Sequence, residues 1–376
     1  MRNDAGHSND SKAATRKRLL VAALLPLGFS LQLLGAFFPN LVENAFSRGL
    51  GRWSQTLIGM PVGLAPFSVA EILLVALGAL GIYRLVAGIQ VWRRREASLK
   101  SLLWQGLQKL LATAGALYLY FVLAWGLNYA RPSFATNAGW SEIAPKEGEL
   151  AQLVTQLIER CNLLRAQLNE DEQGHFLLTT GKAGLEDKLP RAFEQLAASY
   201  PFLDGPKPIL RTPLISPWMT KVGIAGIFSP FTGESHVNAG LPDASFTFAA
   251  CHEVAHRRGV AREDEANFVA YKACVLSGDP ELQYPGYLIA YAHALNELLK
   301  ENRSLAKELH ATLSEAVLKD RAQIAAFWST KTKFEGTLRV IGTQTNNLYL
   351  KAQQQKEGTR SYGHVVKLLL TDARQQ

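Results

Sequence analysis

Three long apolar stretches occupy the first third of the chain and predict three membrane-spanning helices. They cover residues 19–38, 68–90 and 110–127, and the last ends in a group of aromatic side chains. About 20 apolar residues cross the hydrocarbon core of a bilayer as a helix, and aromatic side chains gather at its surface. We therefore expect residues 19–128 to form a membrane region with three transmembrane helices.

Two alternatives concern this membrane region. Arg16, Lys17 and Arg18 precede the first stretch as in a secretory signal peptide, but no convincing small-x-small cleavage site follows and further spans do. The second stretch carries Glu71 and Arg84 near its ends, where charged side chains reach the interface. If this stretch were re-entrant or interfacial, the chain after the third stretch would lie on the opposite side of the membrane.

The distribution of charge predicts the orientation of these spans. Up to Asn128 the chain has 13 Lys and Arg against 5 Asp and Glu, and after it 27 against 27, so the whole net charge of +8 lies in the first third. Basic residues that flank apolar stretches mark cytoplasmic segments. The basic tail 1–18 and the connection around Arg93–Arg95 are therefore cytoplasmic, and 129–376 is an extracytoplasmic domain. Nucleic acid is not an expected partner, whereas the lipid bilayer is.

The pattern after the membrane region predicts an α+β domain in a mainly α chain. Helical spacing of apolar residues marks 145–168 and 190–200, and helices return after Asp243. Between them, residues 208–241 contain short apolar runs broken by proline and glycine, which is typical of strands joined by turns. A small β-sheet is thus expected directly before the helix that begins near residue 244.

That helix contains the chemistry. His252-Glu253-Val254-Ala255-His256 is an H-E-x-x-H motif, and a four-residue step places both imidazoles on one helix face, where they can bind one Zn²⁺. Glu253 is then placed to take a proton from the metal-bound water. The motif also occurs by chance, but Pro242 and Asp243 start a plausible helix and Gly259 can end it.

A catalytic zinc site has three protein ligands, so a third is expected after the motif. Arg262 stands where metzincins have their third histidine, which disfavours that family. The acidic run Glu263 to Glu265 begins the next helix, and Glu265 is the expected ligand. Glu263 is the alternative, because an error of one or two residues in the helix start would exchange the faces of the two side chains. The run would otherwise only stabilise the helix N-terminus electrostatically.

Three segments resemble a family of bacterial membrane proteins known only as a domain of unknown function. They are His252–Tyr271, Trp125–Arg131 and Gly358–Tyr362. The resemblance covers nearly the whole chain and implies three N-terminal spans in the bacterial cytoplasmic (inner) membrane, a zincin-like domain and no known substrate. Glu265–Ala266 also resembles the second-helix glutamate pair of gluzincin peptidases, and Glu263–Phe268 is similar to a pattern in metallopeptidases that cleave repressors.

The predicted function is that of a membrane-anchored zinc-dependent metallopeptidase. His252, His256 and Glu265 would hold Zn²⁺, and Glu253 would be the general base. The strand region 226–238 would bind an extended peptide or protein substrate by main-chain pairing.

An oxyanion donor is also expected. Tyr362 is preferred because it lies in the C-terminal segment of the resemblance, with Arg360, Tyr271 and His293 as alternatives. His236 could lie near the site, although a surface position is the simpler interpretation.

Two rival functions remain. One is a non-catalytic zinc-binding sensor or scaffold domain, whose structural site would be closed by four ligands. The other is a membrane protein without metal, in which the histidines are core residues. Cys161, Cys251 and Cys274 allow at most one intramolecular disulfide and are expected to be buried free thiols. Cys251 points about 100° away from His252 on the helix and is not an expected ligand.

Overall fold

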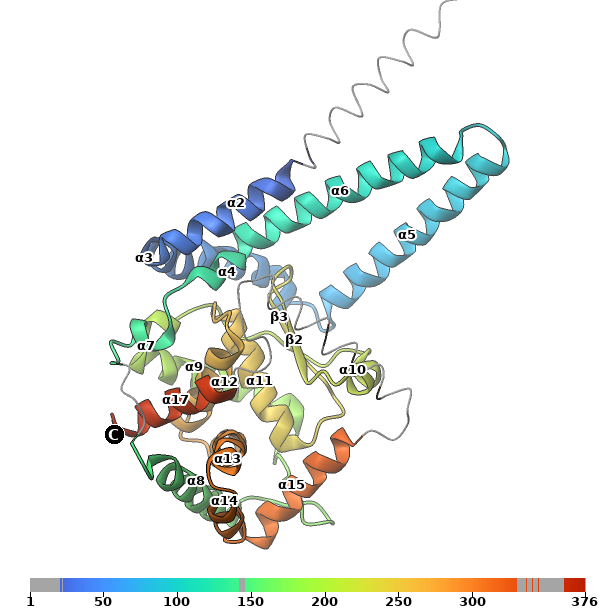
Figure 1. Cartoon of the computed structure of the whole chain (residues 1–376). Helices are drawn as coiled ribbons and strands as arrows, with labels where there is room; N and C mark the ends of the chain where they lie inside the picture. Colours follow the sequence, from blue (N-terminus) through green and yellow to red (C-terminus); the bar gives the residue numbers. More distant parts are fainter. Residues whose placement is uncertain are drawn as a thin grey trace, which may run out of the picture. The chain divides into compact units, whose positions relative to one another are not determined.

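The computed structural model describes residues 23–141, 146–329 and 362–375, together with positions 21, 336, 340 and 344. The chain divides into two compact units. The first contains residues up to Ser54 and Val69–Arg131, and the second contains Gln55–Ser68 and the chain from Pro132. Most described residues are helical, and the second unit contains a small three-stranded sheet (Figure 1). The prediction of a mainly helical chain with a small β-sheet before the motif helix is confirmed.

The first unit consists of helices. They are α2 (Leu24–Phe37), α3 (Pro39–Leu41), η1 (Val42–Leu50), the start of α4 (Gly51–Gly63), α5 (Val69–Arg93), α6 (Leu99–Ala124) and η2 (Gly126–Ala130). Helix α2 runs alongside α6 (Figure 1). Both α5 and α6 are long and apolar enough to cross a membrane, and α2 with the segment Pro39–Gly63 would add a third span if this pair, bent by 102°, is one span. Two or three helices are thus compatible with a membrane protein.

The helices differ from the predicted spans at their ends. The second predicted span, 68–90, corresponds to α5, whereas α6 begins at Leu99, well before the predicted residue 110. The first predicted span, 19–38, lies partly outside the described residues, and its described helix α2 ends at Phe37. The chain bends there because Pro39 lacks an amide hydrogen for the preceding helix but fits the first turn of a new one.

A buried ion pair joins distant segments of the first unit. The guanidinium of Arg131 donates to both carboxylate oxygens of Glu43, at 2.7 Å and 2.9 Å. Nearby, the hydroxyl of Ser47 donates to the side-chain oxygen of Asn128 at 2.8 Å. Two parallel hydrogen bonds to a carboxylate fix both distance and orientation. These contacts therefore hold the residues that follow α6 against η1.

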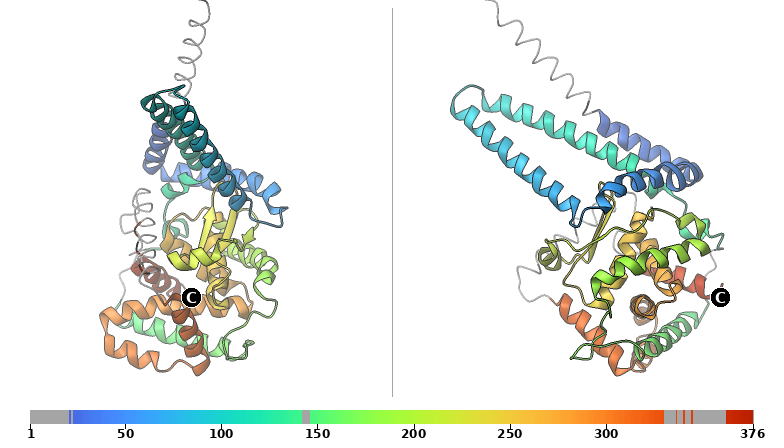
Figure 2. Two further views of the ribbon diagram at one scale, coloured as in Figure 1. Left: turned by 90° about the vertical axis from the view of Figure 1, so that its right-hand side faces the viewer. Right: turned by 180° about the vertical axis from the view of Figure 1, so that it is seen from behind.

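The second unit is built around one helical core. Its helices are α7 (Phe134–Asn137), α8 (Glu149–Arg165), α9 (Leu185–Ser199), α10 (Ser216–Val222), α11 (Asp243–Arg257), α12 (Glu263–Leu276), α13 (Pro280–Glu301), α14 (Arg303–His310), α15 (Glu315–Trp328) and α17 (Tyr362–Ala373), with short turns η3 (Lys182–Gly184) and η4 (Pro201–Leu203). Helix α13 packs against α8, α11 and α12 (Figure 2). Small buried residues such as Ala255, Ala266 and Ala270 let α11 and α12 approach closely. The H-E-x-x-H helix is thus held from several sides.

The sheet lies against α11. Its order is β1 (Leu210–Arg211), β3 (Glu234–Val237), β2 (Gly226–Ser229), with β1 parallel and β2 antiparallel to β3. A Cβ added to Gly226 would lie 2.5 Å from Oε1 of Glu253, so this side of β2 faces α11. Side chains alternate along a strand, so Ile227 and its partner His236 lie on the other face.

The segment Gln55–Ser68, here called the 55–68 segment, belongs to that other face. The side chain of Ser68 is 2.9 Å from Nε2 of His236, and the amide of Gln55 donates to the carbonyl of Pro230 at 3.0 Å. At Gly59 an added Cβ would collide with the guanidinium of Arg257, the last residue of α11. The 55–68 segment, which connects two apolar helices, is therefore part of the second unit. The sequence pattern did not indicate this.

We predict that Gly59→Ala destabilises the second unit while Gly63→Ala does not. Alanine favours helix formation over glycine, but at Gly59 the new Cβ must displace Arg257, whose Nε donates to the carbonyl of Lys207 at 2.7 Å. At Gly63 the nearest atom, Cδ1 of Ile209, would be 3.6 Å away, an ordinary contact. Overpacking costs about 1–3 kcal/mol. Denaturant unfolding of the full chain in detergent measures the difference, and equal stability of the two variants would contradict it.

Candidate metal centre

A tight turn brings the end of α11 next to the start of α12. Gly259 has a φ of 80°, the left-handed conformation that glycine adopts without strain at the end of a helix. The amide of Val260 donates back to the carbonyl of Ala255 at 3.1 Å. The chain then returns, and α12 begins at Glu263. The first residue of α12 therefore lies beside the histidines of α11.

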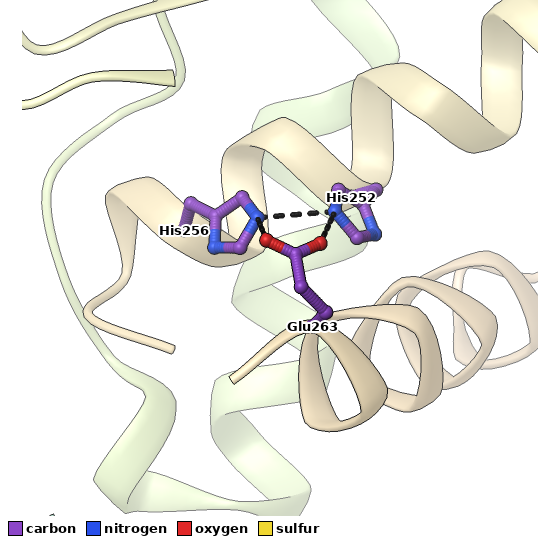
Figure 3. Close-up of side chains that lie close together, drawn as sticks. All are labelled: His252, His256 and Glu263. Carbon is purple, nitrogen blue, oxygen red and sulfur yellow. Dashed lines mark hydrogen bonds and ion pairs between the residues drawn. The ribbon is translucent and has the colours of Figure 1, made fainter. Parts of the chain in front are cut away.

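Three side chains meet at this turn (Figure 3). The Nε2 atoms of His252 and His256 are 3.0 Å apart. The carboxylate of Glu263 places one oxygen 3.3 Å from Nε2 of His252 and the other 3.6 Å from Nε2 of His256. These are the ligand types that zinc takes, and in the described part of the chain they form a group that could hold a metal ion. The two histidine side chains are mostly buried, whereas that of Glu263 is 31% exposed, so solvent reaches the group.

The hydrogen-bond partners of the two Nδ1 atoms fix the tautomer of each imidazole. Nδ1 of His252 is 3.0 Å from Oδ1 of Asn267, and Nδ1 of His256 is 2.7 Å from the carbonyl oxygen of Val260. A carbonyl oxygen only accepts, so each Nδ1 carries a hydrogen and each Nε2 of a neutral imidazole presents a lone pair. Two lone pairs 3.0 Å apart repel each other. The arrangement requires a proton or a cation between them.

The three distances also fit zinc. With bonds of about 2.0–2.1 Å, tetrahedral geometry places neighbouring ligand atoms roughly 3.3 Å apart. The two Nε2 atoms are 3.0 Å apart, and each has its own oxygen of the Glu263 carboxylate at 3.3 Å or 3.6 Å, so every separation is close to this value. Asn267 and Val260 orient the imidazoles as outer partners of metal-ligating histidines do. The donor set and its supporting contacts therefore suit a zinc ion.

The charges of the group are coupled. Burial lowers the pKa of His252, but the hydrogen bond and charge of Glu263 outweigh this and raise it to about 8. Burial raises the pKa of Glu263, yet the neighbouring imidazoles His256 and His252 bring it down to about 2. Burial also lowers the pKa of His256, and the charge of His252 adds to this while Glu263 opposes it. Glu263 is thus a permanent anion that favours a proton or a cation beside it.

Glu253, the residue after His252 on α11, packs against the sheet. Its side chain is buried, and the backbone amide of Phe228 in β2 is hydrogen-bonded to its carboxylate. Burial raises the pKa of Glu253 to about 8, against the opposing effects of His252 and the Phe228 amide. A carboxyl group that titrates near neutral pH is suited to accepting and returning a proton. The close approach of β2 depends on Gly226, where any side chain would meet Glu253.

The structure places the two candidate third ligands differently. Glu265, the residue expected from the sequence, accepts a hydrogen bond from the amide of Phe134 at 2.9 Å and pairs with Arg262 at 3.0 Å. The alternative, Glu263, lies at the histidines. Two residues along a helix correspond to a rotation of about 200°, so only one of the two carboxylates can face α11. Because α12 begins at Glu263, that residue occupies the facing position.

The other predicted residues have varied positions. Tyr362 begins α17, but its side chain lies outside the described part of the chain, as does the whole of Arg360. Tyr271 is buried within α12. Burial, and then the charge of His252, lower the pKa of His293 on α13 to about 4, so His293 is neutral and within electrostatic reach of the group. His236 is buried beside the 55–68 segment.

Sequence reasoning did not find the residues that orient the group. Asn267 lies four residues after Glu263, a spacing that puts both on one face of α12 and could have identified it. The carbonyl of Val260 has no side-chain signal. The approach of Gly226 and Phe228 to Glu253 depends on how the sheet packs on α11, which the local pattern does not specify.

The expectation for the cysteines is confirmed. Cys161, Cys251 and Cys274 are all free and buried. The Sγ atoms of Cys251 and Cys274 are 3.5 Å apart between α11 and α12, away from the cluster of His252, His256 and Glu263. Cys251 therefore contributes to helix packing.

Together these features define a mainly helical protein, with two or three helices apolar enough to span a membrane and a His-His-Glu cluster between two helices. The chain belongs to the DUF3810 family, described as a protein of unknown function, whose family model matches residues 46–370. This confirms the expected membership of a family of unknown function. No curated protein and no solved structure matches the chain significantly.

We predict that Glu263→Gln removes zinc binding and that Glu265→Gln preserves it. Both substitutions keep the size of the side chain, and a glutamine at 265 can still accept the hydrogen bond from Phe134. Loss of a ligand should weaken zinc binding by at least about 100-fold. Zinc titration of the full chain in detergent, with His252→Ala as a second ligand variant, provides the measurement. Zinc retained by Glu263→Gln but lost from Glu265→Gln would contradict this assignment.

Proposed function

We propose that this protein is a membrane-anchored zinc-dependent metallopeptidase. The observation that carries the proposal is the pair of Nε2 lone pairs held 3.0 Å apart beside the Glu263 carboxylate. Their Nδ1 atoms each donate to an oxygen acceptor, so both Nε2 atoms direct a lone pair toward the position where one cation could bind. The ligand set supported by the structure is His252, His256 and Glu263.

The residues around this group support hydrolysis. A zinc ion held there would supply a Lewis acid that polarises a carbonyl and makes water more acidic. Glu253 would accept the proton of the attacking water and return it to the leaving amine. The amide of Phe228 holds the Glu253 carboxylate in place, and Gly226 leaves room for it.

Strand β2 provides a way to bind a peptide. It is one of the two outer strands in the order β1-β3-β2, and one of its amides is hydrogen-bonded to Glu253. An extended peptide that pairs with an outer strand gains main-chain hydrogen bonds whatever its sequence. A substrate paired with β2 would therefore lie beside the proposed base. These features support a zincin-like arrangement and a peptide or protein substrate.

The rival zinc-binding sensor or scaffold is less well supported. A structural zinc site usually has four protein ligands, whereas the group found among the described residues has three. Three ligands leave a position open for water or substrate. The buried Glu253 next to this group is also a poor choice for a purely structural site, since burying a carboxyl group has a cost.

We also propose that the second unit lies outside the cytoplasm, in a protein of the bacterial inner membrane. The support is the basic excess before Asn128, at the N-terminal tail and in the turn between α5 and α6. Basic residues at these positions would keep both segments in the cytoplasm if the chain crosses the bilayer three times.

Glu253→Gln should retain zinc and lose hydrolysis. Glutamine keeps the side-chain volume but cannot accept the proton, so cleavage of a mixture of quenched fluorescent peptides should fall by about 10²- to 10⁴-fold. Zinc content measured on the same sample separates loss of the base from loss of the metal. A Glu253→Gln variant with full activity would exclude this role.

Gly226→Ala should also lower hydrolysis while zinc is retained, because it displaces Glu253 without changing it. The new Cβ would lie 2.5 Å from Oε1 and 2.7 Å from Cγ of Glu253, so the base or the strand must move. We expect reduced kcat with zinc retained. Gly363→Ala in α17 is the matched control, because an added Cβ there meets no atom of the described residues within 4 Å. Equal activity of the two variants would show that β2 does not position Glu253.

A further inference from the structure

Exposed apolar side chains gather on one part of the second unit. Elsewhere on this unit large apolar residues are exposed singly, as Leu163 is on α8. On the 55–68 segment and around α10 they recur at close spacing, and Leu64 and Leu214 are 87% and 90% exposed. We call this set the apolar rim; it consists of Leu57, Met60, Leu64, Phe67, Leu214 and Trp218.

Hydrogen bonds hold the parts of the rim together. The guanidinium of Arg211, in the strand that precedes Leu214, donates to the carbonyl of Ala65 at 2.7 Å. Ser68 and Gln55 fix the two ends of the 55–68 segment to His236 and to Pro230. Both parts of the rim are therefore attached to the sheet, on the side of His236. Ile227 of β2, itself exposed, points to that same side.

Two exposed basic residues lie beside the rim. The 55–68 segment contains no charged residue, and residues 205–233 contain Lys207, Arg211 and Lys221 and no acidic residue. Arg211 is paired with Glu186 and Glu234, whereas Lys207 and Lys221 are exposed. Tryptophan and lysine beside exposed leucines are typical of a surface that lies at the lipid headgroups. Anionic lipids attract such basic residues.

The chain itself connects the rim to a membrane helix. Ser68 is followed directly by Val69, the first residue of α5. The most apolar stretch of α5 has no buried residue. Phe67 is thus within a few residues of a helix that is suited to the bilayer.

We propose that the apolar rim docks on the anionic surface of the bilayer, and that the substrates are polypeptides held at that surface. The second part rests on the proposed peptidase function. Strand β2 contributes Ile227 to the side of the rim and hydrogen-bonds Glu253 through Phe228. A polypeptide anchored in the membrane would therefore meet β2 near its anchor, while a free peptide would gain nothing from the rim.

The docking is tested with a nitroxide label on the full chain in vesicles of phosphatidylcholine and phosphatidylglycerol. The label is attached to Leu214→Cys or, as control, to Leu163→Cys, and the native cysteines are buried. We expect the label at 214 to relax faster with oxygen, which concentrates in lipid, and the label at 163 with a water-soluble nickel complex. Equal exposure of both labels to the nickel complex would overturn the proposal. Protection at 214 from both reagents would also overturn it, because it would indicate a protein partner.

The substrate class is tested with one peptide in two forms, free or attached to an acyl chain in the same vesicles. The ratio of cleavage of the anchored form to that of the free form should fall by about tenfold or more in Leu214→Glu/Trp218→Glu, and stay unchanged in Leu163→Glu. An unchanged ratio in the double variant would refute the substrate assignment. If the wild type cleaves neither form, the peptidase function fails, while the nitroxide measurement still decides whether the rim contacts lipid.

Discussion

The arrangement of the site depends on two imidazole nitrogens that face each other at 3.0 Å. Asn267 and Val260 hold the opposite nitrogens as donors, so the facing pair cannot relieve its repulsion by changing tautomers. Only a cation or a shared proton between the two nitrogens removes this repulsion, and the neighbouring carboxylate of Glu263 favours either. The histidines are thus preorganised for a positive partner, which distinguishes them from two core histidines that happen to share a helix face.

This pair is held in place by how closely the surrounding elements pack. Gly259 allows α12 to return directly along α11, and alanines between the helices permit the short approach. In the sheet, Gly226 allows β2 to lie against Glu253. The proposed metal ligands and the proposed base therefore come from neighbouring positions of a single helix, and each is fixed by a different neighbour.

The sequence predicted the features that depend on local pattern. The apolar helices, the small sheet before the motif and the helical turn between His252 and His256 all follow from periodicity and glycine or proline signals. The choice between Glu263 and Glu265 did not, because it depends on the residue at which α12 begins. Nor did the pattern place Gln55–Ser68 in the second unit, since that depends on contacts such as Ser68 with His236, 168 positions apart.

That long separation has a consequence for biosynthesis. The 55–68 segment leaves the ribosome well before strand β3 and the end of α11, and both α5 and α6 are made in between. Before β3 and the end of α11 are synthesised, the 55–68 segment cannot form its contacts with them. Long-range contacts also form slowly, because a large loop must close first. Completion of the second unit must therefore wait for synthesis of both long apolar helices, so a pause or truncation within them would leave the 55–68 segment without its final contacts.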